Sequence, residues 1–280
     1  MSLSVNQLPI GVFDSGVGGL TVLRALRQRL PNEHLLYLGD TARVPYGTKS
    51  AQSVIRYAEQ AADALYNRGV KAIVIACNTA SAVSIEPLQA RYPDIPVIGV
   101  VQPGAVASCK ASRSGHIGII ATESTVNNFA YQNAILSIRP DASVQAQACS
   151  LFVALAEEGW HTGELVAQII RKCLTPLIDN SQSPIDTLVL GCTHFPVFKS
   201  EIRKIVGNHI ALVDSADTTS QFVAEQLLAK GLLNICNKPP QVRFLVTDGP
   251  DRFARVAPYF FDSAFSAANV ELVDIQHITS

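Results

Sequence analysis

Short runs of apolar, mostly β-branched residues recur along the chain and alternate with longer segments of helical periodicity. Apolar runs of this kind are typical of buried parallel strands, and their alternation with helices predicts an α/β fold. The clearest helical patterns span residues 20–29, 50–68 and 163–177. The predicted strands span residues 10–13, 35–38, 72–76 and 97–101 in the first half, and 117–121, 144–148, 187–190 and 210–213 in the second.

The two halves of the chain correspond in order as well as in kind. Residues 10–15 match residues 117–122 as a first strand and turn, and the third strand of each half runs into a cysteine, Cys77 or Cys192. Matches that recur in register predict an internal duplication. We therefore expect two similar domains with mainly parallel sheets flanked by helices, related by a pseudo-twofold axis, with the active site in the interdomain cleft.

The boundary between the two units is expected near residues 101–104, because the sequence QPG at 102–104 interrupts the pattern. A helical segment at 218–229 and an apolar run at 242–247 follow the second unit and have no counterpart in the other half. We expect this tail to pack on the first unit, which makes that unit discontinuous. The predicted domains are residues 1–100 with 214–280, and residues 101–213.

The composition is that of a well-buried globular protein, with 48% hydrophobic and 16% charged residues among 280. A net charge of −1 gives no electrostatic footprint for nucleic acid or for an anionic membrane. No segment approaches the ~20 apolar residues that span a bilayer, and no signal peptide is expected. The six cysteines lack disulfide-framework spacing, which favours small buried thiols in a reducing cytoplasm.

The segment DSGVGG at 14–19 directly follows the first predicted strand. A glycine-rich turn at this point can present backbone N–H groups to an anion, or it can simply allow strand and helix to pack closely. It matches neither the dinucleotide fingerprint nor the phosphate loop. Asp14 lies at the tip of the strand, where ligands gather in α/β sheets, and this favours a functional role.

The two cysteines that end matching strands are the candidates for chemistry. Cys77 precedes a predicted helix whose N-terminus favours the thiolate, although burial as an inert thiol is the alternative. Cys192 is followed by Thr193 and His194, a spacing that suits half a zinc site or a hydrolytic cysteine–histidine pair. The sequence has no second ligand pair, so no metal is expected, and hydrolysis leaves the matched thiol unexplained.

Paired thiols suit a different reaction, the inversion of a carbon that bears hydrogen. One thiolate removes the proton from one face, and the thiol on the opposite face delivers another. The two groups must be chemically alike because the reaction runs in both directions, and a pKa near neutrality suits both roles. Asp14 beside one thiol and His194 beside the other would tune the transfer.

Four separated motifs resemble the cofactor-independent aspartate/glutamate racemase family, and its glutamate branch in particular. They are DSGVGG at 14–19, DTARVPYG at 40–47, CNTA at 77–80 and GCTHFP at 191–196, and they follow the family order. The resemblance covers the chain from about residue 10 to about residue 225. His194 favours the glutamate branch, because aspartate racemases resemble it with glutamate at that position.

The resemblance implies that Cys77 and Cys192 are the two acid/base residues. It also implies that Asp14, His194 and Glu157 assist them. The implied substrate contacts are Ser15, Pro45, Tyr46, Gly47, Asn78, Thr79, Thr122, Thr125 and Thr193.

The implied reaction is the interconversion of L- and D-glutamate without a cofactor. Pyridoxal phosphate would need a Schiff-base lysine in a phosphate-binding setting, and no lysine occupies a recognisable strand-end site. The resemblance implies a cytoplasmic bacterial enzyme, a homodimer, that supplies D-glutamate for peptidoglycan, with glutamate as its small-molecule partner and no nucleic acid or membrane. Two alternatives stay open: a racemase for aspartate or another acidic amino acid, and a non-catalytic amino-acid-binding regulatory protein on the same scaffold.

Overall fold

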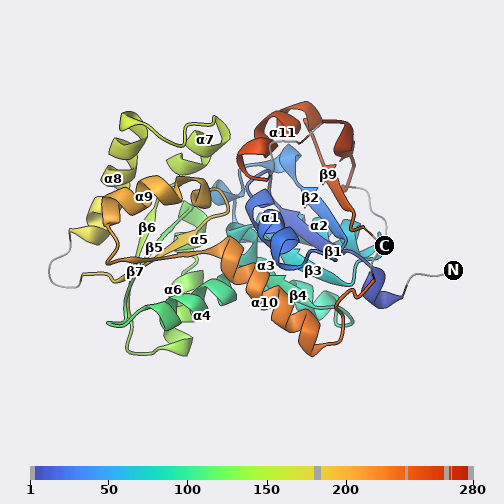
Figure 1. Ribbon diagram of the computed structural model, residues 1–280, viewed down its shortest axis with the longest axis horizontal. Helices are drawn as coiled ribbons and strands as arrows, with labels where there is room; N and C mark the ends of the chain where they lie inside the picture. The colour runs from blue at the N-terminus through green and yellow to red at the C-terminus, as the bar shows by residue number, and fades with distance from the viewer. Residues whose placement is uncertain (1–3, 180–183, 237–238, 262–264, 266, 277–280) are drawn as a thin grey trace.

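The computed structural model describes residues 4–179, 184–236, 239–261, 265 and 267–276. Within these residues the chain forms two sheets of parallel strands. The sheets lie side by side, and each is flanked by helices (Figure 1). The predicted fold class is therefore confirmed.

The first sheet is formed by apolar segments, and its three central strands are buried at every position, as expected for parallel strands covered on both faces. Its strands are β1 (Ile10–Asp14), β2 (Leu35–Gly39), β3 (Ala72–Ile75), β4 (Val97–Gly99), β9 (Val242–Val246) and β10 (Val270–Leu272). The helical elements that accompany it are η1 (Val5–Gln7), α1 (Leu20–Arg29), η2 (Thr41–Arg43), η3 (Tyr46–Thr48), α2 (Ala51–Tyr66), α3 (Asn78–Arg91), α10 (Ser215–Ala229), α11 (Pro250–Val256), η5 (Ala257–Tyr259) and η6 (Ala267–Asn269).

The second sheet is smaller, and its strand β7 is buried throughout. Its strands are β5 (His116–Ala121), β6 (Ser143–Ala148), β7 (Thr187–Gly191) and β8 (Ala211–Asp214). The helical elements around it are α4 (Val101–Ala111), α5 (Glu123–Asn127), α6 (Ala130–Ile138), α7 (Leu151–Glu157), α8 (Glu164–Ile178), η4 (Phe195–Phe198) and α9 (Lys199–Val206).

The two sheets repeat one strand order. The first contains β2-β1-β3-β4 and the second is β6-β5-β7-β8, so the second, first, third and fourth strands of each half are neighbours in that order. The third strands, β3 and β7, pair in parallel with the central strands β1 and β5. The duplication that the sequence predicts is thus present in the topology, and it places each cysteine motif at the carboxyl end of a central strand.

The C-terminal segment extends the first sheet. Strand β9 pairs with β2 and β10 pairs with β9, all in parallel. Helix α10, which leaves β8 of the second sheet, packs against both α1 and α4. These pairings agree with a tail that returns to the first unit. The limits of the two domains stay a prediction. Residues 1–3 and 277–280, which the predicted first domain includes, lie outside the described residues.

One local prediction is wrong. The sequence QPG at 102–104 does not interrupt the chain but lies in the first turn of α4. Proline fits there because the first backbone N–H groups of a helix have no partner within the helix. Gly104 is needed for space, since a Cβ at this position would lie 3.0 Å from the ring of Tyr131.

Helix starts follow the local sequence. Ser50 caps α2 by accepting a hydrogen bond from the backbone of Ser53, and Asp214 caps α10 through the backbone of Asp217. No helix in the described part of the chain is both long and apolar enough to cross a membrane.

Candidate active site

The two duplicated cysteine motifs meet at one cavity. Cys77 follows β3 and occupies the N-cap position of α3, and Cys192 directly follows β7. Both side chains are buried, each with 5% of its surface exposed. Both nevertheless line the same cavity of about 370 Å³. A larger hollow of about 750 Å³ lies between α3, α4 and α10, and neither cysteine lines it.

Most residues that the sequence singled out line this cavity. Asp14 and Thr125 do not line it but are buried beside residues that do. The predicted residues that line it with the cysteines are Ser15, Pro45, Tyr46, Gly47, Asn78, Thr79, Thr122, Glu157, Thr193 and His194. The lining residues for which the sequence carries no local signal of their own are Gly16, Val44, Thr48, Ser150, Val153, Ala154 and Arg252.

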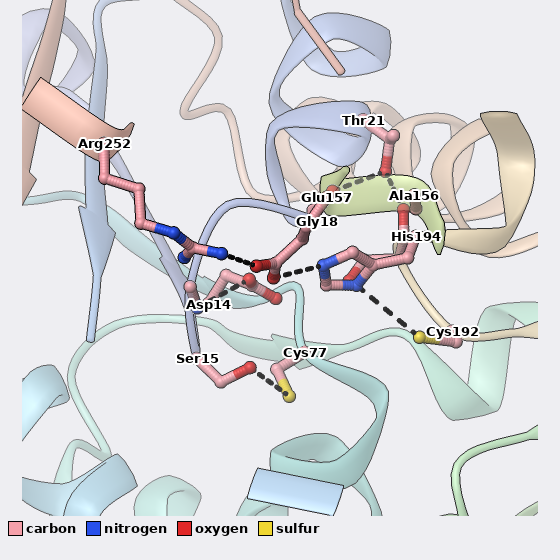
Figure 2. Close-up of polar contacts among 12 residues, drawn as sticks. Asp14, Ser15, Gly18, Thr21, Cys77, Ala156, Glu157, Cys192, His194 and Arg252 are labelled. Atoms are coloured by element: carbon pink, nitrogen blue, oxygen red, sulfur yellow. Dashed lines mark hydrogen bonds and ion pairs between the residues drawn. The ribbon is translucent and has the colours of Figure 1, made fainter. Parts of the chain in front are cut away.

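A chain of polar contacts approaches Cys192 (Figure 2). Its sulfur lies 3.8 Å from Nδ1 of His194, and Nε2 of the same ring lies 3.1 Å from Oε1 of Glu157. The other carboxylate oxygen of Glu157 accepts a hydrogen bond from Arg252 at 2.8 Å. His194 is therefore held between a thiol and a carboxylate that an arginine orients.

The charged groups along this series of contacts stabilise one another. Burial alone would lower the pKa of His194, but its hydrogen bonds to Cys192 and Glu157 raise that pKa to about 10. Burial also opposes ionisation of Glu157, yet His194 and Arg252 hold the pKa of this carboxyl below its usual value. An imidazolium beside a cysteine stabilises the thiolate. The second cysteine motif thus holds a cationic imidazole within reach of the sulfur of Cys192.

The surroundings of Cys77 differ. Its thiol donates to Oγ of Ser15 at 3.4 Å (Figure 2). Burial, and then the nearby carboxyl of Asp14, raise the pKa of Cys77 to about 12. The sequence predicted that the start of α3 would favour the thiolate, and this is wrong for the structure as it stands because burial outweighs the helix dipole. Cys77 is therefore a thiol at neutral pH.

Asp14 is the last residue of β1, and its buried carboxyl lies near the thiol of Cys77. Its Oδ2 accepts a hydrogen bond from the backbone of Gly16 at 2.9 Å, and Oδ1 has no partner among the described residues. Burial raises the pKa of Asp14, although the charge of His194 offsets part of that rise. Because Gly16 turns its N–H toward Asp14, the glycine segment acts here mainly as a tight turn rather than as an anion cradle.

Three threonine hydroxyls join the two halves of the cavity. Oγ1 of Thr79, from α3, lies 3.0 Å from Oγ1 of Thr122 and 3.3 Å from that of Thr125, and the last two are 3.0 Å apart. Gly47 packs against the same place, since a Cβ there would lie 2.9 Å from Cβ of Thr122. The cluster offers adaptable donors and acceptors at the edge of the cavity.

The loop that carries Pro45, Tyr46 and Gly47 is anchored by a buried carboxylate. Asp40 accepts hydrogen bonds from the hydroxyl of Tyr46 and, at 2.6 Å, from Nε of Arg43. The Val44–Pro45 peptide bond is cis. These contacts fix the loop against the cavity that it lines.

Gly18 allows the two halves to approach each other near His194 (Figure 2). A Cβ at this position would lie 2.4 Å from Nδ1 of His194 and 2.6 Å from Oγ1 of Thr193. Thr21 strengthens the contact by donating to the backbone carbonyl of Thr193 at 2.9 Å. The glycine segment of the first half therefore packs directly on the second cysteine motif.

The described residues contain no group of three or more histidine, cysteine, aspartate or glutamate side chains that could hold a metal ion. No disulfide bond joins any of the six cysteines, all of which lie in the described ranges. What the cavity offers is two sulfurs from different halves of the molecule, one beside an imidazolium and one beside a hydroxyl, ringed by hydroxyl and amide groups. This arrangement suits proton transfer to and from the two faces of a small polar molecule.

Comparisons with known proteins agree on one family. A family model for Asp/Glu/hydantoin racemases matches residues 10–223. The chain is 46% identical over 269 residues to the glutamate racemase of Neisseria meningitidis serogroup A, which covers 96% of this chain and 97% of that protein. It is 47% identical over 251 residues to the glutamate racemase of Geobacter metallireducens, covering 90% of this chain and 92% of that one. The crystal structure of glutamate racemase from Francisella tularensis in complex with D-glutamate superposes with a TM-score of 0.88 at 38% identity, covering 97% of this chain and 99% of the other.

Proposed function

The chain belongs to the Asp/Glu/hydantoin racemase family, and we propose that it is a glutamate racemase that interconverts L- and D-glutamate by a two-base thiol/thiolate mechanism. The observation that carries the mechanism is that Cys77 and Cys192, from matching strands of two duplicated halves, line one cavity. Inversion at a carbon needs one proton-transfer group on each face, and the duplication supplies them.

The proton inventory follows from the surroundings of each thiol. The thiolate of Cys192, stabilised by the imidazolium of His194, takes the α-proton of one enantiomer, and the C–H electron pair stays on the α-carbon. The thiol of Cys77 then gives its proton to the opposite face of that carbanion. The reverse reaction starts from the opposite protonation state. No cofactor is needed because the two sulfurs carry both protons.

Charged neighbours help in distinct ways. Glu157 holds His194 in its cationic form, because its carboxylate accepts from Nε2. Asp14 places a carboxyl close to Cys77, and its negative charge, when it is ionised, raises the pKa of this thiol and so keeps the proton on sulfur until a carbanion is there to accept it. A buried, water-poor site strengthens each of these interactions.

Substrate recognition rests on the groups that ring the cavity. Asn78, Thr79 and Thr193 flank the two cysteines in sequence and supply amide and hydroxyl groups for the amino and carboxylate ends of glutamate. Thr125 acts through Thr79 and Thr122, to which it is hydrogen-bonded. Ser15, Pro45, Tyr46 and Gly47 line the remaining wall.

The wider setting is also part of the proposal. We place the enzyme in a bacterial cytoplasm as a homodimer that supplies D-glutamate for peptidoglycan, and hence for cell wall biogenesis and cell shape. The relatives named above are bacterial glutamate racemases, which supports this placement. We divide the protein into residues 1–100 with 214–280 and residues 101–213, a division supported by the pairing of β9 with β2.

The direct test is racemisation of the free amino acid. Purified, reduced protein incubated with L-glutamate in D₂O is expected to replace the α-hydrogen by deuterium, as followed by NMR, and to drive the circular dichroism signal toward zero. L-aspartate is run in parallel. Turnover of aspartate in preference to glutamate would assign the other acidic amino acid, and binding without either change would overturn the racemase proposal.

Gly18→Ala tests the contact between the two halves. The added methyl group meets His194 and Thr193 and is expected to move the imidazole away from Cys192. Displacement of a catalytic group by a fraction of an ångström lowers kcat/KM, here by about tenfold. Initial rates from circular dichroism measure the effect, and thermal unfolding reports whether the fold is kept. Unchanged kcat/KM in a folded variant would contradict the proposed role of this contact.

A further inference from the structure

Tyr131 is a buried residue that the reaction scheme above does not use. It lies in α6, beside the second sheet, and only 1% of its surface is exposed. Its hydroxyl donates a hydrogen bond of 2.7 Å to Oδ1 of Asn78, the residue that directly follows Cys77 on the other half. Tyr131 itself does not line the cavity. It therefore contacts the Cys77 motif from outside the cavity.

The ring of the same tyrosine touches the second cysteine motif. Gly191 directly precedes Cys192, and a Cβ on Gly191 would lie 3.0 Å from Cε2 of Tyr131. On the other edge of the ring, a Cβ on Gly104 would lie 3.0 Å from Cε1 and 3.1 Å from the hydroxyl oxygen. One side chain therefore contacts the residue after one catalytic thiol and the residue before the other.

The hydrogen bond from Tyr131 also determines how Asn78 is turned. With Oδ1 accepting from the tyrosine, the amide nitrogen points elsewhere, and it donates to Oγ of Ser215 at 3.5 Å. An amide nitrogen carries two protons, so a further N–H is left for the cavity that Asn78 lines. Burial raises the pKa of Tyr131 well above its ordinary value, so the hydroxyl keeps its proton.

We propose that Tyr131 is a positioning residue that turns the amide of Asn78 so that its N–H group faces a carboxylate of the bound substrate, while its ring holds the Cys192 motif at a fixed distance from the Cys77 motif. The inference rests on the proposed racemase function. It assigns a role in substrate binding to a residue outside the four motifs that carry the family resemblance.

Tyr131→Phe removes only the hydroxyl and is the main test. The loss of one buried donor, which leaves Oδ1 of Asn78 unpaired and the amide free to turn, is expected to raise KM for glutamate about tenfold. The ring stays in place, so kcat is expected to stay within about twofold of wild type. Tyr92→Phe is the matched control, because Tyr92 is another buried tyrosine whose hydroxyl bonds a carboxylate, that of Asp63, away from this cavity.

A double-variant cycle separates positioning from general support of the fold. If Tyr131 acts through Asn78, then Tyr131→Phe is expected to raise KM in wild type but not in the Asn78→Ala background. Gly104→Ala keeps the hydroxyl but crowds it, in a helix that tolerates alanine, and is expected to raise KM about threefold. It provides a second test should the phenylalanine variant unfold.

The readouts distinguish the two proposals. Isothermal titration of D-glutamate accompanies each rate measurement. If Tyr131→Phe keeps the kcat and KM of the wild type, the proposed role of Tyr131 is overturned and the racemase proposal stands. The same holds if Tyr131→Phe raises KM equally in the wild-type and Asn78→Ala backgrounds. If the wild-type protein binds D-glutamate but does not turn it over, the racemase proposal is overturned. A higher Kd for D-glutamate in Tyr131→Phe would still support the positioning role in that case.

Discussion

Serine in place of Cys77 or of Cys192 is expected to lower kcat for racemisation at least about 10³-fold, for L-glutamate and for D-glutamate alike. A serine hydroxyl has nearly the size of the thiol but gives up its proton far less readily, so it serves neither as base nor as acid at neutral pH. Each inversion needs a base on one face and an acid on the other. The loss of either thiol therefore stops both directions, as circular dichroism of each enantiomer will measure.

The two serine variants are expected to differ in hydrogen exchange. Cys77→Ser keeps the thiolate partner of His194, so it should still exchange the α-hydrogen of the enantiomer whose C–H bond faces Cys192. Cys192→Ser should show the opposite preference and a slower rate, because burial raises the pKa of Cys77 to about 12 and little thiolate is present. NMR of each enantiomer in D₂O measures both rates.

Cys109→Ser provides the control, since Cys109 is a partly buried cysteine of α4 that does not line the cavity. This variant should racemise like wild type. Near-normal turnover by either active-site variant would exclude the two-base mechanism, and exchange of both enantiomers by one variant would show that a single base reaches both faces.

The sequence predicts the positions of the sheet strands and of the cysteines well for a physical reason. A central parallel strand such as β1, β3 or β7 is buried on both faces, so its continuous apolar run is visible without any knowledge of contacts. The abrupt change to polar residues at Cys77 and Cys192 locates the carboxyl ends of β3 and β7, where a ligand binds. Repetition of the pattern then predicts that the two ends are equivalent.

Other parts of the site depend on contacts between distant segments and leave no local signal. Arg252 comes from α11, outside the duplicated halves, and it contacts Glu157 only because β9 returns to the first sheet. Tyr131 looks like any apolar helix residue until its hydroxyl is found on Asn78. The high pKa of Cys77 results from burial by the fold, which the helix N-terminus in the sequence does not reveal.

His194→Asn is expected to lower kcat about 10²-fold, the second-largest effect at this site. Asparagine keeps a polar group near Cys192 but carries no charge at any pH, so the thiolate loses its imidazolium partner. The pH profile provides the specific signature. In wild type, kcat/KM is expected to fall as the pH rises through about 10, where His194 loses its proton. The variant should lack this alkaline limb.

Glu157→Gln adds a graded test of the same charge. The carboxylate is one of the groups that raise the pKa of His194, so its neutral amide should move the alkaline limb below pH 10 without removing it. An alkaline limb that stays in place in His194→Asn would assign the titration to another group and contradict this account.

The free energy of unfolding should also depend on the protonation of His194, and it should decrease as the pH rises. The pKa of His194 is about 10 in the folded protein and about 6.5 for an unfolded histidine, so protonation favours the folded state. That contribution is fully present below about pH 6.5 and disappears as the pH rises toward 10. The free energy of unfolding of wild type relative to His194→Asn, measured by urea titration, should therefore be largest in mild acid and shrink steadily between these two values. A difference that grows with pH would mean that His194 is buried neutral, and the thiolate of Cys192 would then lack the cation on which the proposed first proton transfer depends.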